Sequence, residues 1–504
     1  MQLLLEENGS FSSKCTIEEQ EAGVICPSQS LALVNVQFFG QISQVTSPLL
    51  GQFVDHFGAR ALAYFMTACV WAGLALFLIA TISIDELLYP AYVLLGQATW
   101  MGAILGLHTG MMFEGQTRSR VIFGLNSMFD AGSVTYLGLW AIGEGTGVSL
   151  TQIIGGYLAL SVVLFGAGCY FWAVAEPVVA KDSTQNEPTD TLQEYKESNT
   201  LAATPQATIE TPEEESKVDV NVDQTLTESE AMGGHNSADA HHAENAASQA
   251  SETSREILDP TQYEHLSDAY IPLARRSSWA QLTSPTFILI SLFFTIHATS
   301  NQWMITTTRD FLAFLGDDEI GNKYTLIFSL MMPVSLVALP FTDAVLRNYG
   351  FYGGFQAINA LALGYCLIRL FSDNLNVQIL GFLIFSFYRS FLFGVTLSFL
   401  PAVLAGSVVG KGSGIMFAAT GVAAFVNVPL SAFALQQRNG DFFIPNLIYT
   451  LMLIPCVIAA WLIKRETEKE KRFCEDEIVN AKLRQSRGGV LLSDLRNIEV
   501  GIGQ

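Results

Sequence analysis

The chain has 504 residues, of which 50% are hydrophobic and only 14% are charged. A soluble protein usually carries about 25% charged residues, so a purely soluble protein is excluded. Four stretches contain no Asp, Glu, Lys or Arg, and each is close to the ~20 residues that cross a bilayer: residues 61–82, 150–175, 285–303 and 447–463. Only helices and closed barrels satisfy their backbone in lipid, and runs of this length exclude strands. The sequence therefore predicts an all-α polytopic membrane protein.

Eleven membrane-spanning helices are predicted, five before a long hydrophilic segment and six after it. In chain order they cover residues 29–50, 61–82, 88–112, 121–143, 152–175, 284–306, 323–344, 351–371, 377–400, 405–436 and 443–463. The predicted domains are an outer loop at 1–28, an N-terminal bundle at 29–176, a hydrophilic loop at 177–283, a C-terminal bundle at 284–465 and a cytosolic tail at 466–504.

The net charge of −21 is concentrated in the hydrophilic loop. Between Glu176 and Asp259 there are 19 acidic and 4 basic residues. This segment is poor in aromatic residues and cannot bury enough apolar surface to offset its chain entropy, so residues 177–283 are predicted to be disordered. No basic, aromatic-bearing soluble domain is present to bind nucleic acid, which is excluded as a partner. No CxxC pairs with another CxxC or with histidines, so no metal site is expected.

Lysine and arginine near the span ends indicate the orientation of the chain. If the spans alternate, one side holds Arg60, Arg118, Arg120, Arg275, Arg276, Arg347, Lys411, Lys464 and Arg465. The other side holds Asp85, Glu86, Glu144, Asp317, Asp318, Glu319 and Asp373. The loop and the tail are then cytosolic and the amino terminus is outside.

The predicted outer segment carries two features typical of such a location. Asn8-Gly9-Ser10 is a glycosylation sequon. Cys15 and Cys26 would meet oxidising conditions suited to a disulfide. We expect the plasma membrane, with a vacuolar or other internal membrane as the alternative.

The predicted number of spans is odd, because the amino terminus is outside and the carboxyl terminus inside. No cleavable signal peptide is apparent at residues 1–5. The arrangement is that of a twelve-span protein without its first helix. An incomplete gene model and a true eleven-span protein are the two explanations that the sequence allows.

A motif lies between the first two predicted spans, Gly51-Gln52-Phe53-Val54-Asp55-His56-Phe57-Gly58-Ala59-Arg60. Gly51 lets helices approach closely, and Gly58 permits a tight loop. Arg60 stays at the positive side, and Asp55 could pair with a basic group or a helix N-terminus of the neighbouring bundle. At its glycine, aspartate, glycine and arginine positions the motif resembles the loop signature of the major facilitator superfamily; an ordinary short polar loop is the competing interpretation.

A weaker copy of this motif follows the second span of the second half. Pro340-Phe341-Thr342-Asp343 leads to Arg347 and Gly350. Transporters of this fold consist of two related halves. We therefore interpret the glycines, acids and arginines of both motifs as a conformational gate: Gly51, Asp55, Gly58, Arg60, Asp343 and Arg347.

Three other segments resemble solute carrier family 43, which contains facilitative transporters of large neutral amino acids. They are residues 7–13 with Cys15 and Cys26, residues 118–120 followed by 124–134, and residues 388–394. The resemblance covers both halves but neither the loop nor the tail. It implies a major facilitator fold of two bundles and a neutral amino acid as the substrate.

Two charges lie near the middle of predicted spans, Asp130 in the fourth and Arg389 in the ninth. Charges at this depth are costly in lipid and usually functional. An arginine fork fits a substrate carboxylate with two parallel hydrogen bonds, and an aspartate facing it could hold an ammonium group. A zwitterionic amino acid would satisfy both. A permanent salt bridge between the two, or separate structural pairs, is the competing interpretation.

Polar neighbours extend this candidate site. Asn126 and Ser133 share a helix face with Asp130 because they lie four residues before and three after it. Asn301, Gln302 and Trp303 crowd the predicted outer end of the first span after the loop, where simple helix-end polarity is the alternative. His297 or Asp130 could also titrate and couple protons.

The sequence thus predicts facilitated diffusion of large neutral amino acids by alternating access. The same fold carrying a purine base or a monocarboxylate is one alternative, and a non-transporting nutrient receptor that signals through the acidic loop is another. No intramembrane nucleophile–base or metal-ligand constellation is present, so neither an enzyme nor a cofactor is expected. The expected partners are a small-molecule substrate and the lipid bilayer; no protein partner is indicated.

Overall fold

The computed structural model describes residues 2–21, 26–113, 115–184 and 273–488. Residues 1–176 and 269–504 belong to one compact unit, and all contacts below lie within it. The described residues form helices joined by turns, and they contain no β-strand. Most of the predicted disordered loop, residues 185–272, lies outside the described residues. The end of the unit that carries α1 and Asp317 is called the outer face, after the predicted orientation, and the end that carries Asp55 and Asp343 the inner face.

The N-terminal half begins with short helices and continues with long apolar ones. Its elements are α1 (Gln2–Glu7), η1 (Ser12–Lys14), α2 (Ile17–Glu21), α3 (Pro27–Ile42), η2 (Ser43–Thr46), α4 (Ser47–Ala80), η3 (Asp85–Leu87), α5 (Leu88–Met111), α6 (Gly115–Ala131), α7 (Ser133–Thr146) and α8 (Leu150–Thr184). Pro27 and Pro48 stand in the first turns of α3 and α4, where the missing N–H of proline costs no hydrogen bond.

The C-terminal half repeats this pattern of long helices. Its elements are η5 (Leu273–Arg275), α11 (Ser278–Leu282), α12 (Pro285–Phe314), η6 (Asp318–Ile320), α13 (Lys323–Met331), η7 (Met332–Leu336), α14 (Leu339–Phe371), α15 (Leu375–Val403), α16 (Gly406–Ala424), α17 (Asn427–Ala432), the π-helical turn η8 (Phe433–Gln437) and α18 (Phe443–Gly488). The Ser284 side chain starts α12 by accepting a hydrogen bond from the Phe287 N–H.

Two glycines divide two of the long helices. Gly58 in α4 has a φ of 83° and Gly350 in α14 has a φ of 64°, a region that favours glycine over every residue with a Cβ. Each of these helices therefore contains the end of one predicted span and all or nearly all of the next. The loop predicted around residues 51–60 was wrong in extent, because the helix continues through Phe57 and only Gly58 departs from it.

Other predicted boundaries also change. The span at 121–143 is two helices, α6 and α7, with Gly132 between them. The span at 323–344 is divided into α13, η7 and the start of α14, and the span at 405–436 into α16, α17 and η8. The ends of the predicted loop are helical rather than disordered, since α8 continues to Thr184 and α11 lies at Ser278–Leu282.

Within the described residues, seven helical stretches are long and apolar enough to cross a membrane: Pro27–Ala80, Asp85–Met111, Leu150–Val174, Leu339–Phe371, Leu375–Val403, Gly406–Gln437 and Phe443–Arg472. The first contains two predicted spans, one on each side of Gly58. The predicted spans at 121–143 and 284–306 fall on helices outside these seven. The span at 323–344 begins on a shorter apolar helix, Lys323–Leu336, and its end lies in the stretch that starts at Leu339. The chain is a multi-pass membrane protein.

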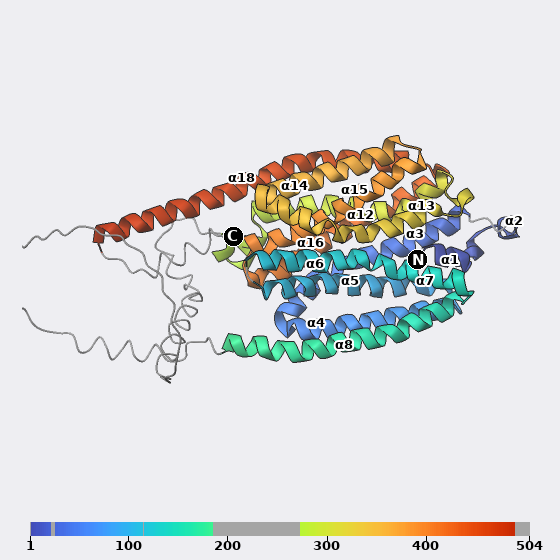
Figure 1. Cartoon of the computed structure of the whole chain (residues 1–504), viewed down its shortest axis with the longest axis horizontal. Coiled ribbons are helices and arrows are strands. Elements are labelled where there is room, and N and C mark those ends of the chain that lie inside the picture. Colours follow the sequence, from blue (N-terminus) through green and yellow to red (C-terminus); the bar gives the residue numbers. More distant parts are fainter. Residues whose placement is uncertain (1, 22–25, 114, 185–272, 489–504) are drawn as a thin grey trace, which may run out of the picture. The chain divides into compact units, whose positions relative to one another are not determined.

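The helices pack closely where small residues meet. A Cβ at Gly96 of α5 would lie 2.1 Å from the carbonyl oxygen of Gly40 in α3, so these two backbones touch. Figure 1 shows α4 and α8 running alongside each other, and Thr67 Oγ1 of α4 lies 3.2 Å from Cys169 Sγ of α8. The Thr151 hydroxyl of α8 donates to Thr81 Oγ1, 3.1 Å away, at the outer end of this helix pair.

The segment predicted as an outer loop, residues 1–28, is largely folded. Leu4, Leu5 and Phe11 are buried in an apolar cluster with Phe77 of α4 and Leu88 of α5. The outer location of this segment stays a prediction, and its described residues fold because the long helices cover the few apolar side chains among its polar ones. The segment thereby holds α1 against the helices of the outer face.

Candidate functional site

An aromatic cluster joins the two halves of the molecule. Trp100 of α5 and Phe417 of α16 have ring centroids 5.1 Å apart, and Phe417 lies 5.8 Å from Phe294 of α12. Phe294 in turn lies 5.7 Å from Phe393 of α15. Tilted and edge-to-face pairs at these distances stabilise one another beyond simple burial. One helix of the N-terminal half and three of the C-terminal half therefore meet at an apolar, aromatic surface, which we call the aromatic cluster.

Arg389 lies beside this cluster. Its guanidinium carbon is 5.6 Å from the ring centroid of Phe393, one turn further along α15, a cation–π distance. The side chain is half-buried, on a helix that is otherwise apolar. A cation and a set of aromatic faces thus lie within one region between the halves.

The neighbouring His297 faces the interior of the C-terminal half. It is fully buried, and its ring nitrogens lie 3.2 Å from the Tyr388 hydroxyl and 3.0 Å from Asn359 Oδ1. The Tyr388 hydroxyl also donates to the His297 carbonyl oxygen, 2.8 Å away. Both ring nitrogens therefore have partners on α14 and α15, and proton coupling through His297 stays a prediction.

The other predicted partners lie on α6 and α7. Asp130 is in the last turn of α6, and Ser133 begins α7, so the two do not share one helix as predicted. The side chains of Asp130 and Ser133 lie outside the described ones. The Asn126 amide donates to the Ile122 carbonyl oxygen of its own helix at 2.8 Å. The facing of Asp130 and Arg389 therefore stays a prediction.

Asn301, Gln302 and Trp303 lie in the middle of α12, not near its outer end, because the helix continues to Phe314. Trp303 is fully buried, and its indole N–H donates to Asn446 Oδ1 at 3.1 Å. Its ring stacks on Phe38 of α3 at 6.3 Å and on Tyr449 of α18 at 5.5 Å. Trp303 therefore connects the two halves on the outer side of the aromatic cluster.

One face of α12 carries polar atoms without hydrogen-bond partners. Gln302 is 4% exposed, and neither its amide oxygen nor its amide nitrogen has a partner. The hydroxyls of Thr295 and Thr299 and the amide oxygen of Asn301 are also buried without a hydrogen-bond partner. The spacing of Thr295, Thr299 and Gln302 places them on one helix face. Because buried polar groups normally have partners, this face is suited to bind a polar solute or water.

Gln44 of η2 is the corresponding residue of the N-terminal half. It is fully buried and neither of its amide atoms has a hydrogen-bond partner. Sequence reasoning missed it, although Gln37, Gln41 and Gln44 recur at helical spacing in an apolar span. That spacing was the available signal, because three amides on one face of a membrane helix are costly unless they face a polar interior.

The halves also touch at the inner face. Asp55 Oδ2 of α4 lies 3.9 Å from Lys411 Nζ of α16, and Arg120 Nη2 of α6 lies 3.3 Å from Asp343 Oδ2 of α14. Asp343 also contacts Arg347 of its own helix. Arg60 is exposed, just after Gly58.

Backbone contacts accompany these ion pairs. A Cβ at Gly51 would lie 2.5 Å from the Gly410 carbonyl oxygen, so α4 and α16 are in direct contact. A Cβ at Gly414 would lie 2.7 Å from the Ser47 carbonyl oxygen. Contacts between the halves therefore occur on both sides of the aromatic cluster.

Comparisons with known proteins address the fold. A scan against protein-family models finds no match, and no curated protein matches the sequence. The structure resembles that of the proton:xylose symporter XylE of the major facilitator superfamily, bound to 6-bromo-6-deoxy-D-glucose, with a TM-score of 0.52 and 11% identity over 91% of this chain and 90% of that one. It also resembles the human organic anion transporter MFSD10 (TETRAN), with a TM-score of 0.49 and 13% identity over 91% of this chain and 89% of that one. The chain has the major facilitator fold.

In this major facilitator fold, the buried Arg369 hydrogen-bonds to side chains of three helices, and the sequence analysis did not identify it as a functional residue. Arg369 of α14 is 3% exposed and donates to the hydroxyls of Thr307, Thr308 and Tyr365 and to Asn446 Oδ1. Its guanidinium carbon lies 4.3 Å from the ring centroid of Phe311. All of these partners are neutral, and their distances from the guanidinium nitrogens are 2.9 to 3.4 Å. The only signal in the sequence was one arginine at the end of an apolar run.

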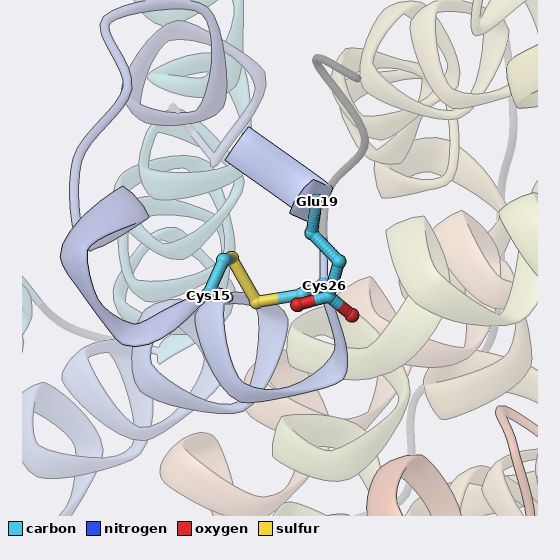
Figure 2. Close-up of side chains that lie close together, drawn as sticks. All are labelled: Cys15, Glu19 and Cys26. Atoms are coloured by element: carbon cyan, nitrogen blue, oxygen red, sulfur yellow. A yellow bond between two sulfur atoms is a disulfide. The ribbon is translucent and has the colours of Figure 1, made fainter. Parts of the chain in front are cut away.

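A disulfide crosslinks the N-terminal segment of the chain. Cys15 and Cys26 form a disulfide, and Figure 2 shows Glu19 beside it. Because the two sulfurs are bonded to each other, they are not thiolates that could hold a metal. Glu19 instead accepts hydrogen bonds from the Thr16 N–H and hydroxyl, and these bonds lower the pKa of Glu19. Asn8 is exposed in the turn after α1.

Proposed function

We propose that this protein transports large neutral amino acids by facilitated diffusion, through alternating access to a site between its two halves. The observation that carries the proposal is the position of Arg389 beside the aromatic cluster. The guanidinium matches a carboxylate in geometry and charge. The aromatic faces match a large apolar side chain. A large neutral amino acid contains both groups.

Polar groups around the cluster support the same substrate class. The unpartnered amides of Gln302 and Gln44 offer donors and acceptors to an α-amino or α-carboxyl group. Asp130, on the neighbouring α6, would hold the ammonium group. A solute that forms hydrogen bonds with these groups on binding offsets the free-energy cost of their desolvation, whereas a purely apolar solute would leave them without partners.

A monocarboxylate is the second candidate, because Arg389 and the aromatic cluster bind an anion with an apolar tail without any ammonium partner. The two candidates differ in their need for Asp130. Asp130→Asn should abolish amino-acid uptake and spare monocarboxylate uptake if the ammonium contact is real.

The test is uptake of labelled leucine into vesicles that contain the full-length protein. We expect Arg389→Ala to reduce uptake at least about 100-fold, since losing a charged contact of about 3 kcal/mol corresponds to that factor. Arg389→Lys should recover only part of it, because a lysine cannot form the two parallel bonds. Arg438→Ala is the matched control, since that arginine pairs with Asp441 near the outer face. Normal leucine uptake by Arg389→Ala would remove the carboxylate role.

A further inference from the structure

Four buried polar side chains join α1 to α12 at the outer face. Glu6 Oε2 lies 3.0 Å from Arg309 Nη2 and accepts from Arg309 Nε at 3.2 Å. The Gln2 amide donates to Glu6 Oε1 at 3.0 Å and to Asp310 Oδ1 at 3.3 Å. The Gln37 amide of α3 donates to Gln2 Oε1 at 3.2 Å. We call Gln2, Glu6, Arg309 and Asp310 the outer quartet.

The outer quartet is almost free of solvent contact. Glu6 and Arg309 are each 9% exposed, Gln2 is 8% exposed and Asp310 is 6% exposed. The second carboxylate oxygen of Asp310, Oδ2, is buried and has no hydrogen-bond partner. The carboxyl groups of Glu6 and Asp310 therefore share one amide donor and lie in the field of one guanidinium.

The charges in the quartet do not balance. Within the quartet, two ionised carboxyls face the single positive charge of Arg309. Outside the quartet, the chain's amino group attracts Glu6, and α3 contributes the neutral Gln37. Glu7, the next residue of α1, points elsewhere and accepts from the Trp140 indole N–H at 3.3 Å. A buried uncompensated charge is expensive, and a carboxyl in that position gains a proton instead.

We infer that the outer quartet is a proton-binding lock, which takes up one proton from the outer solution when the outer face closes and returns it when the face opens. The proton adds to one of the two carboxylates, so the closed quartet becomes electrically neutral. A protonated Asp310 would also place a hydroxyl donor where Oδ2 now has no partner. The inference rests on the proposed alternating access, but on neither the identity nor the binding of the substrate.

The contacts around the quartet place it at a point that must move. Trp303 lies seven residues before Asp310 on α12 and therefore on the same face, and its ring stacks on Phe38 of α3. The quartet and this ring pair are successive contacts between α12 and the N-terminal half. An outer opening that exposes the face of Gln302 must separate both.

The direction of the pH effect follows from burial. Burial raises the pKa of Glu6 above its ordinary value. The attraction of Arg309 and of the chain's amino group, and the hydrogen bonds from Gln2 and Arg309, lower the same pKa, but their combined effect is smaller. A carboxyl whose pKa is raised in the closed state binds its proton more tightly there than in the open state. The closed state therefore loses stability as pH rises above the ordinary carboxyl value of about 4, until the raised pKa is passed.

The test measures access from the outer side with Gln302→Cys in the full-length protein, in right-side-out vesicles. An impermeant thiol reagent reports outer opening without requiring transport of any solute. The labelling rate at each pH is divided by that of the same cysteine in the unfolded chain, because the reacting thiolate is itself more abundant at higher pH. We expect this normalised rate to rise at least tenfold from about pH 5 to about pH 8, and by no more than tenfold per pH unit, the limit for one proton. The chain without the added cysteine gives the background from its own thiols.

Two variants remove the excess charge. Asp310→Asn and Glu6→Gln each leave one carboxylate facing Arg309, so the normalised labelling rate should become independent of pH in both. Asp310→Glu keeps a titrating carboxyl and should keep the pH response. Glu7→Gln is the matched control, since its carboxylate lies next in sequence but contacts Trp140.

The outcomes separate this inference from the proposed function. A normalised labelling rate that is equal at both pH values in the parent chain, or that keeps its full pH response in Asp310→Asn, overturns the lock. If Asp310→Asn does not reach the membrane, Glu6→Gln and the parent's own pH response decide. An intact pH response, together with no leucine uptake by the chain that retains Gln302, would instead contradict only the substrate.

Discussion

Gly51→Ala should open the inner face of the molecule. The added Cβ would lie 2.5 Å from the Gly410 carbonyl oxygen and 3.0 Å from the Gly410 carbonyl carbon. Both are backbone atoms, so the clash is relieved only if α4 and α16 separate. Overpacking of this kind costs about 1–3 kcal/mol, which shifts the equilibrium towards the inner-open state by about 5- to 150-fold.

The assay is cysteine labelling from the inner side in inside-out vesicles. Ser47→Cys is the reporter, because Ser47 is fully buried and its carbonyl oxygen packs against Gly414 of α16. We expect Gly51→Ala to raise the labelling rate within the stated range. A folded Gly51→Ala variant with an unchanged labelling rate would refute the reasoning.

Two other glycines serve as controls for this experiment. A Cβ at Gly364 meets no atom within 4 Å, so Gly364→Ala should change nothing. A Cβ at Gly96 would clash with the Gly40 carbonyl oxygen inside the N-terminal half. Gly96→Ala should therefore lower the melting temperature without favouring either face.

Three further outcomes are expected. Arg369→Ala removes the hydrogen bonds between α14, α12 and α18, and it should reduce the free energy of unfolding by about 2–4 kcal/mol. An unchanged melting temperature in detergent would contradict this. Asp343→Asn removes a partly exposed carboxylate that is shared by two arginines. Because exposed ion pairs contribute about 0–1 kcal/mol to stability, the rate of cysteine labelling from the inner side should rise no more than about fivefold. Cys26→Ser removes a disulfide between residues 11 apart in sequence. This should lower the free energy of unfolding of the outer segment by about 3 kcal/mol and make its proteolysis faster. Equal rates of cleavage with and without the disulfide would argue against this.

The membrane helices were largely predictable from the sequence, because hydropathy and backbone freedom are local properties. Uncharged runs of about 20 residues predicted helical spans, and Gly58 and Gly350 lie where the structure has its two positive-φ breaks within long helices. The extent of the break was not predictable. Residues 51–57 are polar enough for a loop, but contact between α4 and α16 gives their helix a surface to pack on.

The candidate site was predictable only as residue types. Arg389 was expected from its charge in an apolar run, but its place beside Phe393, Phe294 and Phe417 depends on three helices. Trp303 was predicted to be a substrate contact near the outer end of its span, whereas its indole lies in the middle of α12 and is buried against Asn446. Asp130 and Ser133 keep their predicted roles as predictions, since their side chains lie outside the described ones.

The sequence by itself determined that this chain is helical, crosses a membrane many times and has two halves on either side of an acidic segment. The tertiary structure alone decided which buried charges meet. Glu6 and Arg309 are 303 residues apart in the chain, and no local pattern specifies that α1 and α12 lie together. Such pairs depend on how the two halves pack, because a buried charge is tolerated only where another part of the chain supplies its partner.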